Sequence, residues 1–465
     1  MRFVYSWLIR CAAPFAFAVV LWRGVRDRSY WQGLRERFGL GRSLPSPSIW
    51  LHAVSLGEMS AAAPLAHALR SRYPQLPMVV TAATPAGRAR ASDLFGDTAD
   101  IRFLPYDTPG SVKRFLERIR PCVAIIMETE LWPNLFRECE RRGVPVFLAS
   151  ARLSAKSASR YGRLGRLFSG VFTPNVAVAA QSAEDAERFR SIGAAATQTR
   201  VIGNVKFDLR LDDGTLAAGK TLRAAYGGSS GSSASSASRS VWVAGSTHAG
   251  EEEQVLEAHV LLRVRCPDAL LLLVPRHKDR FAAVAELLNR RGIKFARRSA
   301  MTRGGTAESL TETPAETLPI DTAVLLVDTM GELATLYASA DVAFVGGSLV
   351  PIGGHNLLEP AALGLPVLTG PSHFNGKEIA LLLLGRGAAL QVAGAEELAA
   401  ELQRLFEQPA ERRRIGMIGK EIVESNRGSV ARLLALIEPS LPVEHSPPEA
   451  NQAGAAAQAH PSAER

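Results

Sequence analysis

The chain has 465 residues, which suggests two or three domains of ordinary size. Its composition, 47% hydrophobic and 21% charged, excludes a disordered or fibrous protein. Lys and Arg outnumber Asp and Glu by 54 to 45, so we expect an acidic partner: a membrane surface, nucleic acid or a small anion. The cysteines lie far apart without a CxxC pair, which predicts neither a disulfide framework nor a cysteine zinc site.

An apolar run opens the chain. Residues 3–22 are almost uniformly apolar, and a helix of that length just spans a hydrocarbon core of about 30 Å. Arg10 and Pro14 interrupt the run. Six arginines follow, which suits the cytoplasmic side of a membrane or contact with acidic headgroups: Arg23, Arg26, Arg28, Arg35, Arg37 and Arg42. We expect a retained membrane anchor and basic segment over residues 1–45, spanning the membrane or lying in its interface. A cleaved signal peptide and an apolar helix packed on the core are the alternatives.

Short apolar runs alternate with helical stretches from residue 46 to residue 225. The runs are rich in Val, Ile and Ala without alternation, as in strands buried on both faces, and they cover 50–54, 78–84, 122–127 and 144–150. Residues 58–72 and 85–95 between them have helical character. This βαβ succession predicts a Rossmann-like domain with a parallel sheet.

A serine-rich stretch at 226–240 is typical of a flexible insertion. A second βα series follows over 241–440, with strands expected at 241–245, 269–275, 322–328, 341–347 and 365–370. Residues 299–319 are expected to form a polar surface loop, and 441–465 a disordered tail. Two Rossmann-like domains would bind ligands in the cleft between them, at the carboxyl ends of the strands.

Acidic residues follow two strands of the first series. Glu58 opens a helix directly after the first strand, where a carboxylate can act as general base toward a hydroxyl or simply complement the helix dipole. Glu128 and Glu130 follow the strand at 122–127. Two carboxylates at the mouth of a buried strand are costly unless they bind something or accept hydrogen bonds, and one of them could cap the helix that Trp132-Pro133 begins.

The second series has cationic and glycine-rich strand ends. Pro275-Arg276 begins a basic cluster suited to a phosphate or carboxylate. Met330-Gly331-Glu332 ends a strand and opens a helix, whose N–H groups favour an anion while Glu332 could accept from a base or sugar. Two glycine pairs precede Asn356–Glu359, which lets backbone approach a ligand closely. Ordinary tight turns with helix caps are the alternative. No HxH or HExxH spacing occurs, so no metal site is expected.

Taken in order, these segments resemble the Kdo transferases, which add 3-deoxy-D-manno-octulosonic acid (Kdo) to lipid A precursors in Gram-negative bacteria. The resemblance covers about residues 1–440 and rests on the motifs HAVSLGE, METELWPN, SARLSAKSASRY, GNVKFD, STHAGEE, LLLVPRHKDRF, DTMGEL and the stretch 344–371. It implies the GT-B glycosyltransferase fold, with two Rossmann-like domains facing across a cleft. It also implies CMP-Kdo as donor, lipid IVA as the lipid A precursor that accepts, and inverting transfer without a cofactor. The expected location is the cytoplasmic side of the cell inner membrane, among its lipids and without a nucleic-acid partner.

The resemblance also implies roles for individual residues. By motif, Glu58 would be the general base, and Glu128 and Lys206 would stabilise the transition state. The residues that would hold CMP are Pro275, Arg276, Met330, Gly331, Glu332, Asn356, Leu357, Leu358 and Glu359. The chain departs from the family pattern at Ser150, often Asn, and at Pro351-Ile352, often a charged pair. The rival hypotheses are another GT-B enzyme using a UDP-sugar and a non-catalytic tether that binds anionic lipid.

Overall fold

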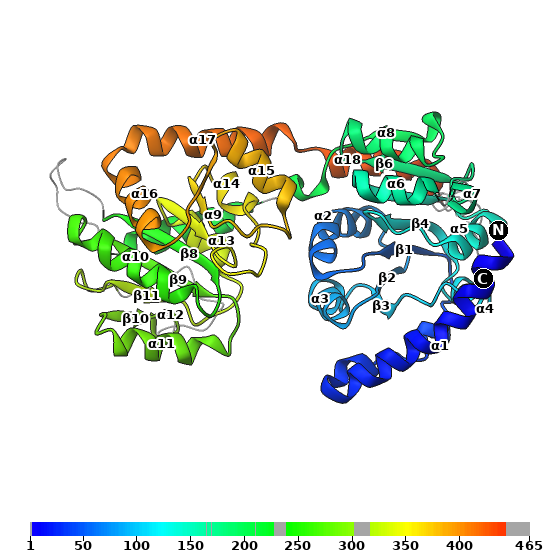
Figure 1. Ribbon diagram of the computed structural model, residues 1–465, viewed down its shortest axis with the longest axis horizontal. Coiled ribbons are helices and arrows are strands. Elements are labelled where there is room, and N and C mark those ends of the chain that lie inside the picture. The colour runs from blue at the N-terminus through cyan, green and yellow to red at the C-terminus, as the bar shows by residue number, and fades with distance from the viewer. Residues whose placement is uncertain are drawn as a thin grey trace, which may run out of the picture. The chain divides into compact units, whose positions relative to one another are not determined.

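The computed structural model describes residues 2–163, 165–168, 170–209, 211–226, 239–301 and 317–442. They form two compact α/β units (Figure 1): the first comprises Met1–Ile202 and the chain from Ala431, and the second comprises Gly203–Val430. The units thus divide the chain at other positions than the expected ranges 46–225 and 241–440. The expected serine-rich insertion, polar loop and tail fall mainly on 227–238, 302–316 and 443–465, outside the described residues.

Packing explains why the segment after Ile202 belongs to the second unit. Helix α9 (Asp213–Ala225) packs on α13 (Leu333–Ala338) so closely that a Cβ added to Gly219 would lie 2.5 Å from Cβ of Ala338. The Asp208 carboxylate also accepts hydrogen bonds from the backbone N–H groups of Gly428 and Val430. These contacts join the two ends of the second unit.

The first unit is built on a seven-stranded parallel sheet in the order β3-β2-β1-β4-β5-β6-β7. Strand β1 lies in the sheet interior between β2 and β4, with Leu51 opposite both Val80 and Ile125. Every residue of β1, β2 and β5 is buried, as their unalternated apolar runs predict. The strands are β1 (Ser48–His52), β2 (Met78–Ala82), β3 (Asp100–Phe103), β4 (Pro121–Met127), β5 (Val146–Ala151), β6 (Val176–Ala180) and β7 (Thr199–Val201).

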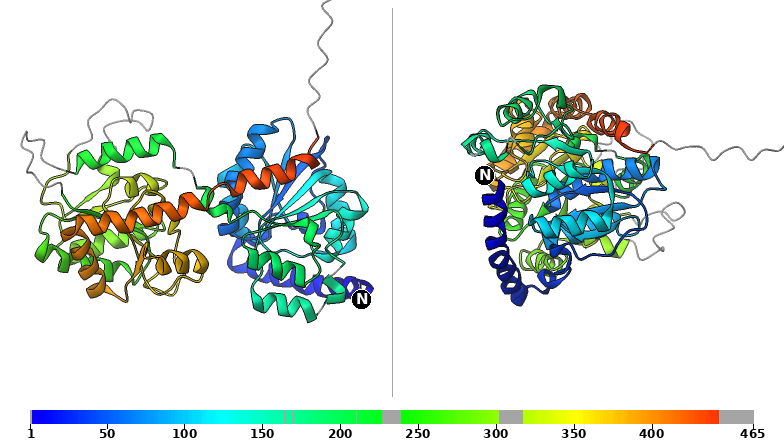
Figure 2. Two further views of the ribbon diagram at one scale, coloured as in Figure 1. Left: turned by 90° about the horizontal axis from the view of Figure 1, so that it is seen from above. Right: turned by 90° about the vertical axis from the view of Figure 1, so that its right-hand side faces the viewer.

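Helices cover both faces of this sheet (Figure 2). They are α1 (Arg2–Arg26), α2 (Leu56–Arg72), α3 (Pro85–Phe95), α4 (Pro109–Ile119), α5 (Pro133–Arg141), α6 (Ala155–Arg163), α7 (Gly165–Phe168), α8 (Ala183–Ser191) and α18 (Ser429–Ile437), with short 3-10 turns η1 (Arg28–Trp31), η2 (Glu36–Phe38), η3 (Ala196–Gln198) and η5 (Glu438–Ser440). The predicted helices at 58–72 and 85–95 are confirmed as α2 and α3.

The apolar segment at the start of the chain forms α1. Within it, Val4–Arg26 is long and apolar enough to cross a membrane, and none of its most apolar window is buried. The helix nevertheless contacts the first unit: Tyr5 Oη donates to the Asp107 carboxylate at 2.9 Å, and the Phe17 ring packs edge-on against Phe38 with centroids 5.1 Å apart. One arginine of the basic segment cannot contact lipid headgroups: Arg37 is buried, with its guanidinium 4.0 Å from the Phe103 ring centroid.

The second unit repeats the architecture with a parallel sheet in the order β10-β11-β9-β8-β12-β13-β14. Its strands are β8 (Val241–Thr247), β9 (Leu270–Pro275), β10 (Phe295–Arg297), β11 (Val324–Leu326), β12 (Val342–Val345), β13 (Val367–Thr369) and β14 (Ala389–Gln391). Its helices are α9, α10 (Glu252–Arg265), α11 (Arg280–Arg290), α12 (Arg298–Met301), α13, α14 (Leu358–Ala362), α15 (Lys377–Gly385), α16 (Ala395–Glu407) and α17 (Pro409–Ser425), with the turn η4 (Val205–Asp208).

Candidate functional site

The strand order of the first sheet marks where a ligand is expected. The connection after β1 leads to β2 on one side, and the connection after β4 leads to β5 on the other. Neighbouring strands whose connections diverge form a topological switch point, the place where parallel sheets bind ligands. Glu58 follows β1 and Glu128 follows β4, so the structure brings both predicted residues to this switch point.

Glu58 lies in the first turn of α2 and is only partly exposed. Ser55 is the N-cap of α2: its hydroxyl accepts from the Glu58 N–H at 3.3 Å and donates to the Glu58 carboxylate at 2.9 Å. The carboxylate also accepts from the Val54 N–H at 2.9 Å. This reciprocal arrangement is similar to a capping box, except that the Glu58 carboxylate accepts from the N–H of Val54 and from the Ser55 hydroxyl instead of from the Ser55 N–H. The expected helix-terminus role of Glu58 is therefore present, and the same bonds fix the direction of its carboxylate.

Glu128 occupies an uncommon backbone conformation at the end of β4. Its φ is +54°, in the left-handed region, which costs a non-glycine residue about 1 kcal/mol or more. Its N–H donates to the Ala149 carbonyl at 3.0 Å, and its carboxylate lies 3.8 Å from the Arg152 guanidinium. Strained residues are concentrated at functional sites, so this geometry supports a role for Glu128 beyond the turn itself.

Glu130 completes the cluster. Burial, with the charges of Glu58 and Glu128 adding to its effect, raises the pKa of its carboxyl to about 7. The alternative that Glu128 or Glu130 caps the next helix is wrong. Trp132 is the N-cap of α5, and its side chain makes no capping hydrogen bond. Three carboxylates therefore converge at the switch point. The sequence identified Glu130 without assigning it to the site.

The second sheet has its own switch point, between β8 and β12. His248 follows β8 and His355 follows β12, and their Nε2 atoms lie 2.8 Å apart with the rings stacked at an interplanar angle of 6°. Burial lowers the pKa of His355 to about 4, with Arg276, His248 and His277 adding to the effect. Burial likewise lowers the pKa of His248. Both rings are therefore neutral at pH 7, and one donates to the other.

Glu251 shapes the loop that carries His355. Its carboxylate is fully buried and accepts from three successive N–H groups after β12: Gly347 at 2.7 Å, Ser348 at 3.0 Å and Leu349 at 2.9 Å. Neither His248 nor Glu251 was given a role from the sequence. The signal was available for His248, because it follows a predicted strand as Glu58 does.

The predicted donor residues lie at the same edge of the second sheet. Arg276 follows β9, and its N–H donates to the Thr247 carbonyl at 2.9 Å. Its charge contributes to the lowered pKa of His355, so its side chain lies near the histidine pair. Met330 is 49% exposed and Gly331 has φ +90°. Glu332 is less available, because its carboxylate accepts from Arg298 Nε at 2.8 Å.

The segment Asn356–Glu359 begins α14. Asn356 is exposed, and its amide donates to the Glu359 carboxylate at 3.0 Å while its oxygen accepts from the Leu358 N–H at 3.1 Å. Leu357 and Leu358 are buried at 4% and 0% exposure in a core cluster with Phe207 and Val345. Their side chains support the loop, so any contact they make with a ligand comes from the backbone.

Lys206 lies in η4, half-buried between the buried Val205 and Phe207. It belongs to the second unit, whereas Glu58 and Glu128 belong to the first. Across the described ranges, no three His, Cys, Asp or Glu side chains are grouped so that they could hold a metal ion.

Known proteins match the chain over most of its length. Residues 32–209 match a family model described as 3-deoxy-D-manno-octulosonic-acid transferase (kdotransferase). The 3-deoxy-D-manno-octulosonic acid transferase of Haemophilus influenzae is 38% identical, covering 95% of this chain and 99% of that protein. The enzyme of the same name from Bordetella pertussis is 37% identical, with coverage of 94% and 99%.

A solved structure supports the fold. The UDP-GlcNAc 2-epimerase from Neisseria meningitidis, bound to UDP-GlcNAc, matches with a TM-score of 0.53 at 13% identity, over 84% of this chain and 100% of that chain. At this identity the likeness concerns the fold alone. Together with the two parallel sheets, it confirms the predicted α/β architecture of two Rossmann-like units.

Proposed function

The chain belongs to the Kdo transferase family, glycosyltransferases of lipopolysaccharide biosynthesis, and from this premise we propose that it transfers Kdo from CMP-Kdo to the lipid A precursor lipid IVA. The single observation that carries the proposal beyond the family is the carboxylate cluster of Glu58, Glu128 and Glu130 at the switch point of the first sheet. A sugar hydroxyl needs a base at such a position to become a nucleophile.

In the proposed reaction, the acceptor hydroxyl oxygen attacks the anomeric carbon of Kdo and forms the new C–O bond. The bond from that carbon to the phosphate oxygen breaks, its electron pair leaves with CMP, and the hydroxyl proton passes to Glu58. Attack opposite the departing phosphate inverts the configuration. The two hydrogen bonds that Val54 and Ser55 donate to Glu58 fix the direction of its carboxylate, as a positioned base requires.

The donor side of the proposal uses the second unit. Positive charge at Arg276 and Lys206 would stabilise the departing phosphate, and the glycine-rich turn before Asn356 would admit CMP close to the backbone. Glu128 would orient a cationic side chain, the Arg152 guanidinium, which lies 3.8 Å from its carboxylate.

We also propose that the enzyme works at the cytoplasmic side of the cell inner membrane. The apolar helix α1 supports membrane association, and its acceptor would be a lipid. The basic residues near its carboxyl end, such as Arg23 and Arg26, suit contact with anionic headgroups on that side.

Mass spectrometry of the products tests the proposed function. Purified full-length protein is incubated with CMP-Kdo and tetraacylated lipid A precursor, and we expect the acceptor to gain the mass of one or more Kdo units. NMR of the new linkage should show the anomeric configuration opposite to that of CMP-Kdo. A protein that leaves CMP-Kdo unused and transfers from a UDP-sugar instead would refute the proposal.

A further inference from the structure

An arginine interrupts the apolar helix α1, where a helix surrounded by lipid accommodates it poorly. Ser6, Arg10 and Phe17 are spaced four and seven residues apart, so they share one face of the helix. On this face Ser6 Oγ donates to Asn134 Oδ1 at 2.8 Å and Phe17 packs on Phe38. Arg10 therefore belongs to the side of α1 that contacts the first unit.

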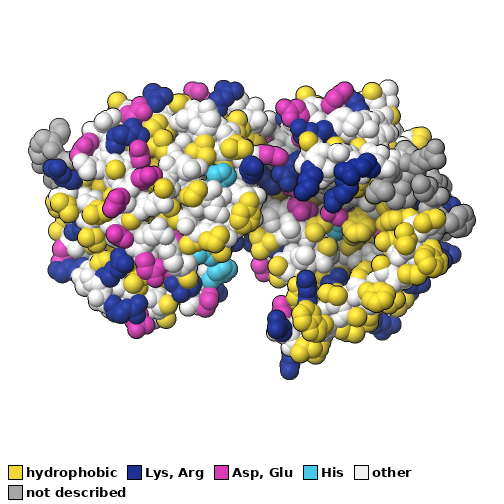
Figure 3. Space-filling view, viewed as in Figure 1, with side chains coloured by type: hydrophobic (Ala, Val, Ile, Leu, Met, Phe, Trp, Pro, Cys, Tyr) yellow, Lys and Arg dark blue, Asp and Glu magenta, His cyan; other side chains and the backbone are white. Residues whose placement is uncertain are grey.

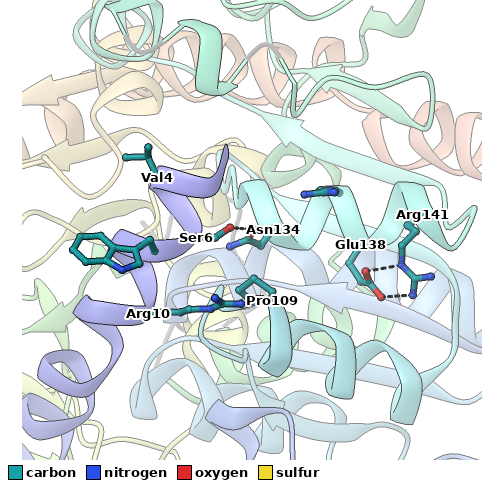
Figure 4. Close-up of a pocket in the computed structure, with 9 residues that line it drawn as sticks. Val4, Ser6, Arg10, Pro109, Asn134, Glu138 and Arg141 are labelled. Atoms are coloured by element: carbon teal, nitrogen blue, oxygen red, sulfur yellow. Dashed lines mark hydrogen bonds and ion pairs between the residues drawn. The ribbon is translucent and has the colours of Figure 1, made fainter. Parts of the chain in front are cut away.

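A pocket of about 650 Å³ opens between α1 and the neighbouring helices. Its cationic lining consists of Arg10 from α1 and of Arg137 and Arg141 from α5, and Pro109 begins α4 at its edge. Figure 4 shows Arg10 extending toward Pro109, with the Ser6–Asn134 hydrogen bond closing one end. The pocket is thus framed by the anchor helix on one side and by the sheet-covering helices on the other.

The charges of the pocket do not cancel. Glu138 is matched by Arg141, whose guanidinium donates to both carboxylate oxygens at 2.9 and 2.7 Å, and Arg142 adds a third bond at 2.8 Å. Arg10 and Arg137 are exposed, and their guanidinium groups make no hydrogen bond or ion pair with any other described residue. Two guanidinium groups therefore remain to bind an anion, and their planar geometry favours a phosphate.

The pocket adjoins an apolar surface. Val4 and Trp7 line it, and on the outward face of α1 Trp7, Phe15 and Trp22 are 64%, 75% and 64% exposed. Apolar side chains gather along α1 in Figure 3. A cationic pocket beside a continuous apolar strip suits an amphiphile whose phosphate enters the pocket while its chains follow the helix. A soluble phosphate would use only half of this surface.

We infer that the pocket between α1 and α5 binds the phosphate of an anionic phospholipid of the membrane, held by Arg10 and Arg137. The lipid would pin α1 in the interface beside the first unit, with Arg10 neutralised rather than exposed to hydrocarbon. The inference rests on the proposed membrane location, but its test measures lipid binding and does not depend on Kdo transfer.

Calorimetry with a short-chain phosphatidylglycerol, kept below its micelle concentration, tests the site on the full chain. We expect saturable binding at one site, weakened about tenfold or more in R10Q/R137Q. R10K/R137K should bind at an intermediate level, because it keeps the charge and loses the two-pronged hydrogen bonding. R163Q/R200Q removes the same charge from exposed positions on α6 and β7 of the first unit and should bind as wild type does.

Three outcomes would overturn the inference. Equal losses in R10Q/R137Q and R163Q/R200Q would mean diffuse charge attraction instead of a site. Inorganic phosphate binding as tightly as the lipid would mean a site for free phosphate. Unchanged phosphatidylglycerol binding in R10Q/R137Q, with a raised KM for detergent-dispersed lipid A precursor, would assign the two arginines to the acceptor.

Discussion

At the scale of single residues, the three carboxylates at the first switch point lie close enough for their charges to repel, and each has different partners. Glu58 accepts two hydrogen bonds from Val54 and Ser55, and Glu128 faces the Arg152 guanidinium. For Glu130, burial outweighs its partners and raises the carboxyl pKa to about 7. A carboxyl group with a raised pKa beside other carboxyl groups is typical of acid–base sites.

The raised pKa of Glu130 predicts a pH-dependent stability. Its folded pKa, about 7, lies above the ordinary 4.5, so the folded chain binds the proton more tightly than the unfolded chain does. Stability therefore falls as pH rises from 4.5 through 7. We expect E130Q to gain about 1–2 kcal/mol relative to wild type between pH 5 and pH 8, measured as the change in Tm at the two pH values. E140Q, an exposed control on α5, should gain nothing. A Tm difference that is the same at both pH values would contradict the assignment.

The sequence identifies a site residue when that residue directly follows a predicted strand. Glu58 and Glu128 were found because parallel strands end at one edge, so residues just after them converge. The pairing of His248 with His355 was not predicted, because 107 residues separate them and no local pattern records a contact that the sheet order creates. The side chains of Leu357 and Leu358 pack in the core, and a motif does not distinguish a side chain that contacts a ligand from one that packs beneath the site.

At the scale of elements, the turn after β12 depends on one buried carboxylate. Glu251 accepts from Gly347, Ser348 and Leu349, which fixes the loop that carries His355 and Asn356. The loop has little room for alternatives, since a Cβ on Gly346 would lie 2.7 Å from Glu251 Oε2. The loop conformation is thus set by α10, an element about a hundred residues earlier in the chain.

Replacing Glu251 should therefore disturb both stability and donor binding. In E251Q an amide NH₂ group replaces one acceptor and faces backbone donors, so we expect a loss of roughly 3 kcal/mol in unfolding free energy. Thermal unfolding followed by circular dichroism measures the loss, and calorimetry should show weaker CMP binding. E257Q, an exposed change on the same helix, is the matched control. If E251Q is destabilised but binds CMP with wild-type affinity, the loop after β12 does not take part in CMP binding.

Strands in the sheet interior were predictable, and strands at its margins were not. β1, β2, β4, β5, β8 and β9 are continuous apolar runs because both faces are covered. The outermost strands β3, β7, β10 and β14 are short and partly exposed, so their sequences lack that signal. β6 was also missed, although Val176–Ala180 is apolar.

At the scale of the whole molecule, two Rossmann-like units were predictable from the repeated βα pattern, but their boundaries were not. Residues 203–225 pack with the second unit through α9, and α18 completes the first unit from the far end of the chain. The packing of the chain's last helix on the first unit is set by contacts between distant segments, for example the ion pair of Arg72 with Glu438 at 2.6 Å. Periodicity in a sequence carries no information about it.

Removal of the anchor tests its role. Deleting residues 1–22 removes the exposed apolar face of α1 together with its contacts to Asp107 and Phe38. We expect most of the protein to leave the membrane fraction while turnover of detergent-dispersed acceptor stays within about threefold of wild type. Truncation after residue 442 is the control and should leave membrane association unchanged. An unfolded deletion variant would instead support α1 as a core helix.

The most direct test of the account compares kcat for Kdo transfer in wild type, E58Q and S55A, with Tm measured alongside. E58Q cannot take a proton, but its carbonyl oxygen can accept from the Val54 N–H while its NH₂ group donates to the Ser55 hydroxyl. We therefore expect kcat to fall about 10²- to 10⁴-fold with little change in Tm. S55A weakens the cap, so Tm should fall by the equivalent of about 1 kcal/mol while kcat remains near wild type. Near-normal kcat in E58Q would contradict the account, because Glu58 would then cap a helix and do nothing to the acceptor.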